Sequence, residues 1–169
     1  MNGAGSGKRL VVIGGTAAGL SAASKAKRTR PDLEVEVYER SGFVSYGACG
    51  LPYYVGGLVA SENDLVSLTR ETLEGERGIR TFIRCEATGI DVAGKTVAVE
   101  NLTSGERRDV AYDFLVLATG ASPVIPELPG IRSEGVFFLR TLEDGMALRS
   151  AVRAPGARTA TVPGAGMIG

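Results

Sequence analysis

Histidine is absent from this chain of 169 residues, and its absence restricts the chemistry that the chain can perform. Imidazole is the most common general acid–base group near neutral pH and a frequent zinc ligand. A base must therefore be a carboxylate, a tyrosine, a lysine or a bound cofactor. The sequence predicts no metal site.

The chain also has no net charge and only two cysteines, and it lacks a long apolar run near its N-terminus. Lys plus Arg and Asp plus Glu number 19 each, so no net charge favours nucleic acid or an anionic membrane. The two cysteines indicate a reducing compartment and not a disulfide scaffold. The longest apolar run near the N-terminus, Leu10–Ile13, is too short for a signal peptide or a membrane span. We therefore expect a soluble, cytoplasmic protein whose length suits one well-buried domain.

Glycine, by contrast, is abundant: the 24 glycines are roughly twice the usual share. They cluster at turns between regular segments. Arg9–Ile13 is typical of a buried strand, Leu20–Arg30 of a helix ended by Pro31, and Leu33–Glu39 of a second strand. Such a β-turn-α-β unit has the size of a mononucleotide-binding half.

The remaining pattern predicts an α/β, Rossmann-like fold in which a parallel sheet carries a β-meander excursion. The other predicted elements are a helix over Thr69–Glu76, a strand over Ile79–Arg84, the β-meander over Glu86–Tyr112, a central buried strand over Phe114–Ala118, a strand over Val136–Leu139, a helix capped by Thr141 and a strand from Arg158.

The turn Gly14-Gly15-Thr16-Ala17-Ala18-Gly19 follows the first strand and opens the first helix, as a dinucleotide-binding fingerprint does. Backbone N–H groups at the start of that helix would face a pyrophosphate. Glu39 lies 20 residues after Gly19, where an acid accepts the ribose hydroxyls. Thr16 replaces the middle glycine and crowds the approach of the phosphate. The alternative is a structural turn followed by an ordinary strand-end glutamate.

Two further glycine motifs follow. Thr119 and Gly120 end an apolar strand and would bring the backbone close to a ligand at the carboxyl end of the sheet. The segment Gly164-Ala165-Gly166-Met167-Ile168-Gly169 matches G-x-G-x-x-G, although Pro163 removes a ladder donor just before it. Two fingerprints imply two dinucleotides, but the second stops where its helix should begin.

Cys49 lies in the stretch Ser45-Tyr46-Gly47-Ala48-Cys49-Gly50-Leu51-Pro52, about thirty residues beyond the first fingerprint. A dithiol enzyme would need a second cysteine five positions later, where this chain has Tyr54. Thiol chemistry here would therefore use one cysteine and pass through a mixed disulfide, a sulfenic acid or a persulfide. We interpret Cys85 as a packed strand residue.

Together these motifs cover nearly the whole chain, which resembles the N-terminal FAD domain of the pyridine nucleotide-disulfide oxidoreductases. The resemblance is to their single-cysteine branch, which contains coenzyme A-disulfide reductases, NADH oxidases, NADH peroxidases and NADH-dependent sulfur reductases. The most specific motif is the stretch 45–52, which is similar to the active-site signature of the branch. The resemblance implies that Cys49 is the redox-active residue beside the flavin. It implies FAD contacts at Gly14, Ala18, Gly19, Glu39, Arg40, Ala87, Thr119, Gly120 and Arg140.

Within the branch, the oxidases and peroxidases usually have a histidine where this chain has Ala17. The sequence is more similar to the coenzyme A-disulfide reductases, which implies that coenzyme A is bound by Ser21, Lys25, Arg28 and Ser45. Arginine and lysine suit its phosphates. The alternative is that the basic residues form a solvated helix face near a C-terminus, where cations are favoured anyway.

The resemblance also implies a domain division: 1–8 as a flexible lead-in, 9–157 as an incomplete FAD-binding domain, and 158–169 as the first strand and turn of a truncated NAD(P)-binding domain. Full-length members continue through that domain and form homodimers. We therefore expect weaker FAD binding than in the whole enzyme and no NAD(P)H-dependent turnover from this chain alone.

The function that the resemblance implies for the full-length parent is FAD-dependent oxidation of NAD(P)H, with coenzyme A disulfide or a related disulfide or persulfide as the oxidant. One alternative is an NADH oxidase or a sulfur reductase, in which Cys49 passes through a sulfenic acid or a persulfide. Another is a non-catalytic FAD-binding fragment.

Overall fold

The computed structural model describes residues 7–164, which divide into two compact units. Unit 1 consists of the described residues up to Gly47 together with Asn63–Ser122. Unit 2 consists of Ala48–Glu62 and the described residues from Pro123 onward.

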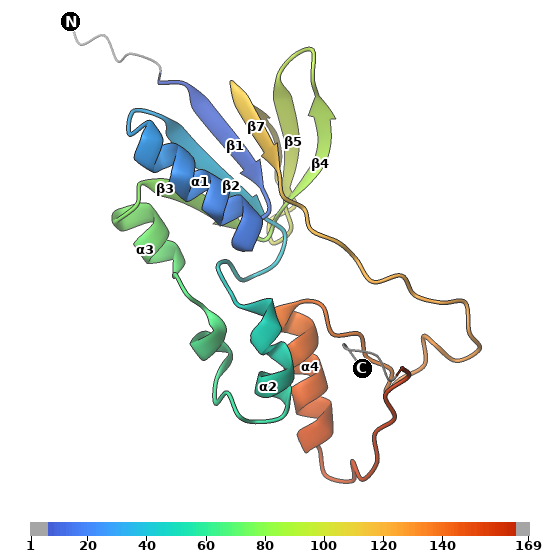
Figure 1. Cartoon of the computed structure of the whole chain (residues 1–169). Coiled ribbons are helices and arrows are strands. Elements are labelled where there is room, and N and C mark those ends of the chain that lie inside the picture. Colours follow the sequence, from blue (N-terminus) through green and yellow to red (C-terminus); the bar gives the residue numbers. More distant parts are fainter. Residues whose placement is uncertain (1–6, 165–169) are drawn as a thin grey trace, which may run out of the picture. The chain divides into compact units, whose positions relative to one another are not determined.

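A four-stranded parallel sheet is the centre of unit 1 (Figure 1). Its strand order is β3-β2-β1-β7, so the first and last strands in the sequence lie next to each other. The elements are β1 (Arg9–Ile13), α1 (Ala17–Thr29), β2 (Glu34–Glu39), α3 (Arg70–Gly75), β3 (Ile79–Ile83) and β7 (Phe114–Leu117). The predicted β-turn-α-β unit is therefore confirmed, with the helix beginning three residues before Leu20.

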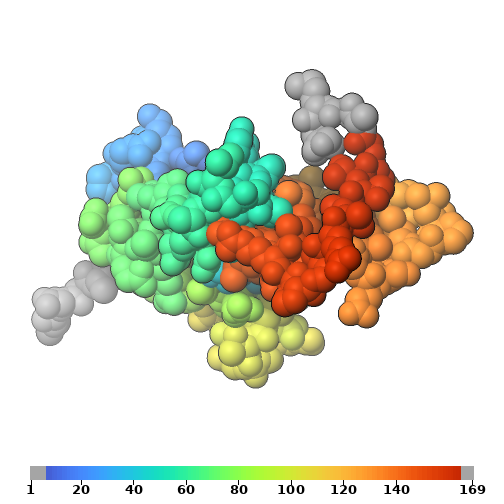
Figure 2. Space-filling view, turned by 90° about the horizontal axis from the view of Figure 1, so that it is seen from below, coloured from blue at the N-terminus to red at the C-terminus, as the bar shows by residue number. Residues whose placement is uncertain are grey.

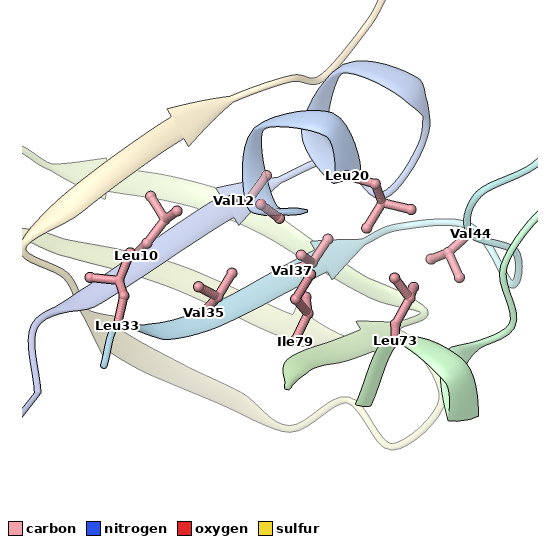
Figure 3. Packing of buried hydrophobic residues seen from close by; sticks show 10 residues of the cluster. Leu10, Val12, Leu20, Leu33, Val35, Val37, Val44, Leu73 and Ile79 are labelled. Carbon is pink, nitrogen blue, oxygen red and sulfur yellow. The ribbon is translucent and has the colours of Figure 1, made fainter. Parts of the chain in front are cut away.

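One face of this sheet packs against helices α1 and α3 (Figure 3). Val12, Val35 and Val37 project from the strands toward Leu20 of α1 and Leu73 of α3. All five side chains are buried. Successive residues of a strand face opposite sides of the sheet, and Val11, Ile13 and Tyr38 give the other face an apolar cluster of its own.

The second face of the parallel sheet packs against a three-stranded antiparallel sheet with the order β4-β5-β6. Its strands are β4 (Cys85–Asp91), β5 (Thr96–Asn101) and β6 (Arg107–Ala111), which confirms the predicted β-meander. Glu36 of β2 is buried, and its carboxylate accepts a hydrogen bond from the Tyr38 hydroxyl at 2.7 Å and pairs with Arg80. These partners satisfy a charge that would be costly to bury alone.

Strand β7 corrects one prediction, because it lies at the edge of the described sheet and not at its centre. Phe114 and Leu117 are 47% and 59% exposed. An apolar run predicts burial on both sides, but burial also requires a neighbouring strand or helix. Within residues 7–164, β7 pairs only with β1.

Unit 2 contains the short helix α2, preceded by the 3₁₀ turn η1, and the longer helix α4. Helices α2 and α4 contact each other. The bounds are η1 (Ala48–Gly50), α2 (Leu51–Val55) and α4 (Leu142–Arg153), with a second 3₁₀ turn, η2 (Glu62–Leu65), at the border with unit 1.

The predicted cap of α4 is confirmed. The Asp144 amide donates to the Thr141 hydroxyl at 3.2 Å, and the Asp144 carboxylate accepts from the Thr141 amide at 2.7 Å. This is a reciprocal capping box. No helix within residues 7–164 is long and apolar enough to cross a membrane.

Two predicted strands are not formed. Residues 136–139 and 158–164 have no regular secondary structure, because a strand requires a partner for its hydrogen bonds and unit 2 contains no sheet among its described residues. The prediction of a second fingerprint falls largely on residues 165–169, which lie outside the described residues. The domain division therefore stays a prediction.

Candidate functional site

The turn between β1 and α1 requires glycine for steric reasons. Gly14 has a φ of +108°, and a Cβ atom there would collide with the carbonyl oxygen of Ala118. A Cβ atom at Gly19 would collide with the carbonyl oxygen of Gly14. The first glycine therefore permits close approach to the end of β7, and the last permits the helix to pack onto the turn.

The N-terminus of α1 has the features of an anion-binding helix end. Thr16 is its N-cap but makes no side-chain hydrogen bond to the first turn, which contains no acidic residue. First-turn N–H groups lack intrahelical partners, so they can donate to a phosphate placed there. The predicted FAD contacts Ala18 and Gly19 lie in this turn.

Glu39, at the end of β2, reaches the same turn. One carboxylate oxygen accepts the Gly15 amide at 2.6 Å, and the other accepts the Ser41 amide at 2.8 Å. A carboxylate oxygen has a second lone pair, so each can also accept a ribose hydroxyl. The spacing of 20 residues therefore brings an acceptor to the turn, as the fingerprint requires.

The other predicted FAD contacts fall in four places. Thr119 and Gly120 are exposed just after β7, where the Ala118 amide donates to the Ile13 carbonyl at 2.7 Å. Arg40 follows β2 and forms an ion pair of 3.6 Å with Glu86 of β4. These residues belong to unit 1, as does the half-buried Ala87, whereas Arg140 belongs to unit 2. Their contacts with a flavin stay predictions.

A cavity of about 410 Å³ opens in unit 1 beside helix α1. Three of the four residues predicted to bind coenzyme A line it: Ser21, Arg28 and Ser45. Lys25 is exposed and does not line the cavity. The complete lining consists of Thr16, Ala17, Leu20, Ser21, Ser24, Arg28, Ser45, Tyr46, Gly47, Ser67, Leu68 and Arg77.

The fold brings further polar residues to this cavity that the sequence did not single out. Ser24 lies one turn after Ser21, so helical spacing alone could have identified it. Ser67 is joined to the lining because its amide donates to the Ser45 carbonyl at 2.7 Å. Arg77 follows α3, and nothing in its local sequence indicates the cavity. Two guanidinium groups and several hydroxyls suit an anionic ligand.

Cys49 lies in η1 of unit 2, and its side chain is exposed. It is a free thiol, two residues before α2 begins at Leu51. An exposed thiol is accessible to a disulfide or an alkylating reagent. Its role beside a flavin stays a prediction.

Cys85 is also a free thiol, but its surroundings differ from those of Cys49. It lies at the start of β4, is 8% exposed and packs in the cluster with Val97 and Val99. Burial raises the pKa of its thiol, an effect that the nearby Arg108 partly opposes. The interpretation of Cys85 as a packed strand residue is therefore confirmed.

Comparisons with known proteins agree with this geometry. Residues 8–169 match the family model described as "Pyridine nucleotide-disulphide oxidoreductase". The NADH oxidase of Methanocaldococcus jannaschii is 38% identical over 162 residues, a match that covers 95% of this chain and 36% of that protein. The NAD(P)H coenzyme A polysulfide/persulfide reductase of Pyrococcus horikoshii is 35% identical over 162 residues, covering 96% and 35%.

Among solved structures, reduced CoADR-RHD of Bacillus anthracis matches with a TM-score of 0.84 and 32% identity, covering 88% of this chain and 27% of that chain. This chain therefore spans about a third of the length of the curated relatives named above. The α/β fold with its antiparallel excursion is that of the FAD-binding part of such proteins.

Proposed function

This chain belongs to the pyridine nucleotide-disulphide oxidoreductase family, and we propose that it forms the FAD-binding part of an enzyme that reduces coenzyme A disulfide, or a related disulfide or persulfide, with NAD(P)H. The family binds FAD and NAD(P)H. The choice of coenzyme A disulfide as the substrate rests on the cavity lined by Ser21, Arg28 and Ser45. The parent enzyme is proposed to be a cytoplasmic homodimer.

The residues around the α1 turn fit FAD. Gly14, Ala18 and Gly19 would present the backbone to its pyrophosphate, and Glu39 would accept its ribose hydroxyls. When bound, FAD supplies two-electron transfer between NAD(P)H and a thiol or disulfide. The other proposed contacts are Arg40, Ala87, Thr119, Gly120 and Arg140.

Coenzyme A suits the cavity because it carries several phosphate groups. Arg28 and Arg77 can neutralise them, and the serine hydroxyls can donate hydrogen bonds to their oxygens. Ser45 precedes Cys49 by four positions, a stretch that spans at most about 14 Å of extended chain. The covalent chain therefore keeps Cys49 near Ser45, which is one of the residues that line the cavity.

The proposed chemistry at Cys49 is thiol–disulfide exchange. The Cys49 thiolate attacks one sulfur of the substrate, its bond to the second sulfur breaks, and one coenzyme A thiolate leaves. The resulting mixed disulfide takes two electrons, which come from NAD(P)H. Cys49 and the second coenzyme A thiol are thereby released, so one NAD(P)H reduces one disulfide to two thiols.

The alternative within the family is an NADH oxidase or a sulfur reductase, as the names of two relatives suggest for those proteins. Sulfur reduction agrees equally well with a single exposed cysteine. Oxidase activity is less favoured, because Ala17 supplies no imidazole beside the cavity. A third candidate, a non-catalytic FAD-binding fragment, is tested by the same experiments.

The first experiment is the visible absorption spectrum of the purified chain before and after addition of FAD. A flavin band that persists after gel filtration supports the proposed cofactor site. A colourless protein would favour a site that requires further segments of the parent.

The second experiment assays the full-length parent with NAD(P)H and coenzyme A disulfide, elemental sulfur or oxygen. We expect disulfide reduction that Cys49→Ser abolishes while flavin absorbance remains, with Cys85→Ser as the matched control. Reductase activity retained by Cys49→Ser would refute the proposed role. Sulfide release or oxygen uptake without disulfide reduction would favour the alternatives.

A further inference from the structure

Arg149 of helix α4 is one of two charged side chains buried within residues 7–164; the other is Glu36 of unit 1. Whereas Glu36 pairs with arginine, Arg149 contacts main-chain carbonyls and an aromatic ring. Its two terminal nitrogens donate to the carbonyls of Val59 at 2.9 Å and Ala60 at 3.0 Å. Its guanidinium carbon lies 4.2 Å from the centre of the Tyr54 ring. Burying an arginine in this way is favourable only when its donors are satisfied.

All three partners belong to the segment that follows Cys49. Tyr54 is the fourth residue of α2, and its hydroxyl donates to Glu62 at 3.2 Å. Val59 and Ala60 lie in the loop after α2. Arg149 therefore ties the end of α2 and the following loop to α4.

The beginning of α2 is held against α4 as well. Leu51 is buried, and its Cδ2 atom lies 3.0 Å from the position that a Cβ atom on Gly145 would occupy. Gly145 precedes Arg149 by four residues, so both lie on the same face of α4. Figure 2 shows the surface of α2, in teal, directly beside that of α4, in red-orange. Helix α4 thus contacts both ends of α2, immediately after the Cys49 turn.

We propose that Arg149 is a positioning residue for Cys49, an inference that rests on the proposed function. A five-residue helix is too short to be stable alone, so the direction of η1 and α2 depends on packing against α4. Attack by a thiolate requires alignment with the sulfur–sulfur bond of the substrate. A large substrate held by its phosphates needs this alignment to be preset, whereas a small disulfide can approach from any direction.

The test compares variants of the 169-residue chain in a Cys85→Ser background, so that Cys49 is the reacting thiol. The variants are Arg149→Met, Arg149→Lys and, as the control, Arg132→Met, which removes an exposed arginine of unit 2 outside α4. Arg153 is not used as the control, because its guanidinium lies beside Gly57 in the segment after α2. The exchange rate of Cys49 is measured with coenzyme A disulfide and with 2-hydroxyethyl disulfide. Amide hydrogen exchange is followed along the chain.

We expect Arg149→Met to slow the reaction with coenzyme A disulfide by about tenfold or more, since misplacement of reacting groups has effects of this size. The reaction with 2-hydroxyethyl disulfide should change by less than about twofold, because it needs no preset orientation. Arg149→Lys should recover part of the rate, and Arg132→Met should match the parent chain. Amide exchange should rise in residues 51–60 but not in β1 or α1.

Two results would overturn the inference. One is an Arg149→Met chain that reacts with coenzyme A disulfide as fast as Arg132→Met does. The other is an equal loss of rate with both disulfides together with faster amide exchange throughout the chain, which indicates general unfolding. If the unmodified chain does not prefer coenzyme A disulfide, the proposed substrate fails. The role of Arg149 is then tested by amide hydrogen exchange alone. Faster exchange in Arg149→Met that is confined to residues 51–60 supports the inference, and unchanged exchange there refutes it.

Discussion

Cys49 and Cys85 lie in different surroundings. Cys49 lies exposed in a 3₁₀ turn of unit 2, and the helix after it has five residues. Cys85 lies buried at the start of a strand of unit 1 that pairs with β5 from Cys85 to Asp91, apart from a register shift between Ala87 and Gly89. One region presents its thiol to solvent, and the other encloses it.

This difference shows that the local fold, and not the residue type, decides whether a thiol is available for chemistry. In β4 the side chain faces Val97 and Val99, so packing fixes it and burial disfavours the thiolate. In η1 the Cys49 side chain is exposed. Reactive cysteines are accessible, whereas packed ones behave as small apolar residues.

The largest expected effect tests this contrast directly. Iodoacetamide should alkylate Cys49 on the order of 100-fold faster than Cys85 in the native chain, because Cys85 reacts only after local opening. Mass spectrometry of peptides from quenched time points gives both rates. In urea the two rates should converge, which controls for intrinsic reactivity. Similar rates in the native chain would contradict the contrast.

A smaller effect tests whether exposure alone explains the proposed role of Cys49. If the cavity binds the phosphates of coenzyme A, Arg28→Met should raise the KM of the parent for coenzyme A disulfide about tenfold, the size expected for loss of one charge-assisted hydrogen bond. The kcat should change little. Steady-state kinetics measures both constants.

The matched control is Arg30→Met, which removes an exposed arginine from the C-cap of the same helix, where it pairs with Asp32 at 2.7 Å. It should leave KM unchanged. An equal rise in KM for both variants would point to general electrostatic attraction and would argue against binding in the cavity.

The smallest expected effect concerns Cys85 and pH. Burial raises the pKa of this thiol in the folded chain, so the folded state keeps its proton where the unfolded chain loses it. Its contribution to stability is complete below the ordinary thiol pKa of about 8.5 and is lost as the pH rises through the raised value. In Cys85→Ala, the free energy of unfolding should therefore decrease less steeply as the pH rises above about 8.5.

The free energy of unfolding is measured by urea unfolding between about pH 7 and about pH 10, a range that includes the ordinary thiol pKa of about 8.5. All variants carry Cys49→Ser, so that Cys85 is the only thiol. Cys85→Ala will lower stability at every pH through lost packing. The informative quantity is the slope with pH. An unchanged slope would show that Cys85 ionises as easily in the folded as in the unfolded chain.

Short-range patterns predicted much of unit 1 correctly. Alternation in Leu33–Glu39, the glycine turn at 14–19 and the meander over 86–112 each correspond to the observed elements. Glu39 also reaches the turn, because two parallel neighbouring strands end at the same edge of a sheet. These features depend on neighbours within a few residues or on the register of adjacent strands.

Other features depend on which partners the folded chain provides. The apolar run at 114–117 indicated a strand but not its place at the sheet edge. Residues 136–139 have the composition of a strand, yet within residues 7–164 no segment pairs with them as a strand. Arg77 and Arg149 resemble ordinary surface arginines in sequence, but one lines the cavity and the other is buried against α2.

Residue order therefore specifies the dinucleotide-type turn, the single cysteine at position 49 and the acid at the end of β2. Each follows from local backbone chemistry or from a fixed spacing. The cavity, the enclosure of Cys85 and the attachment of α2 to α4 arise only when distant segments pack together. Burial and hydrogen bonding join residues such as Arg149 and Val59, which lie 90 positions apart, and no local pattern encodes such a contact.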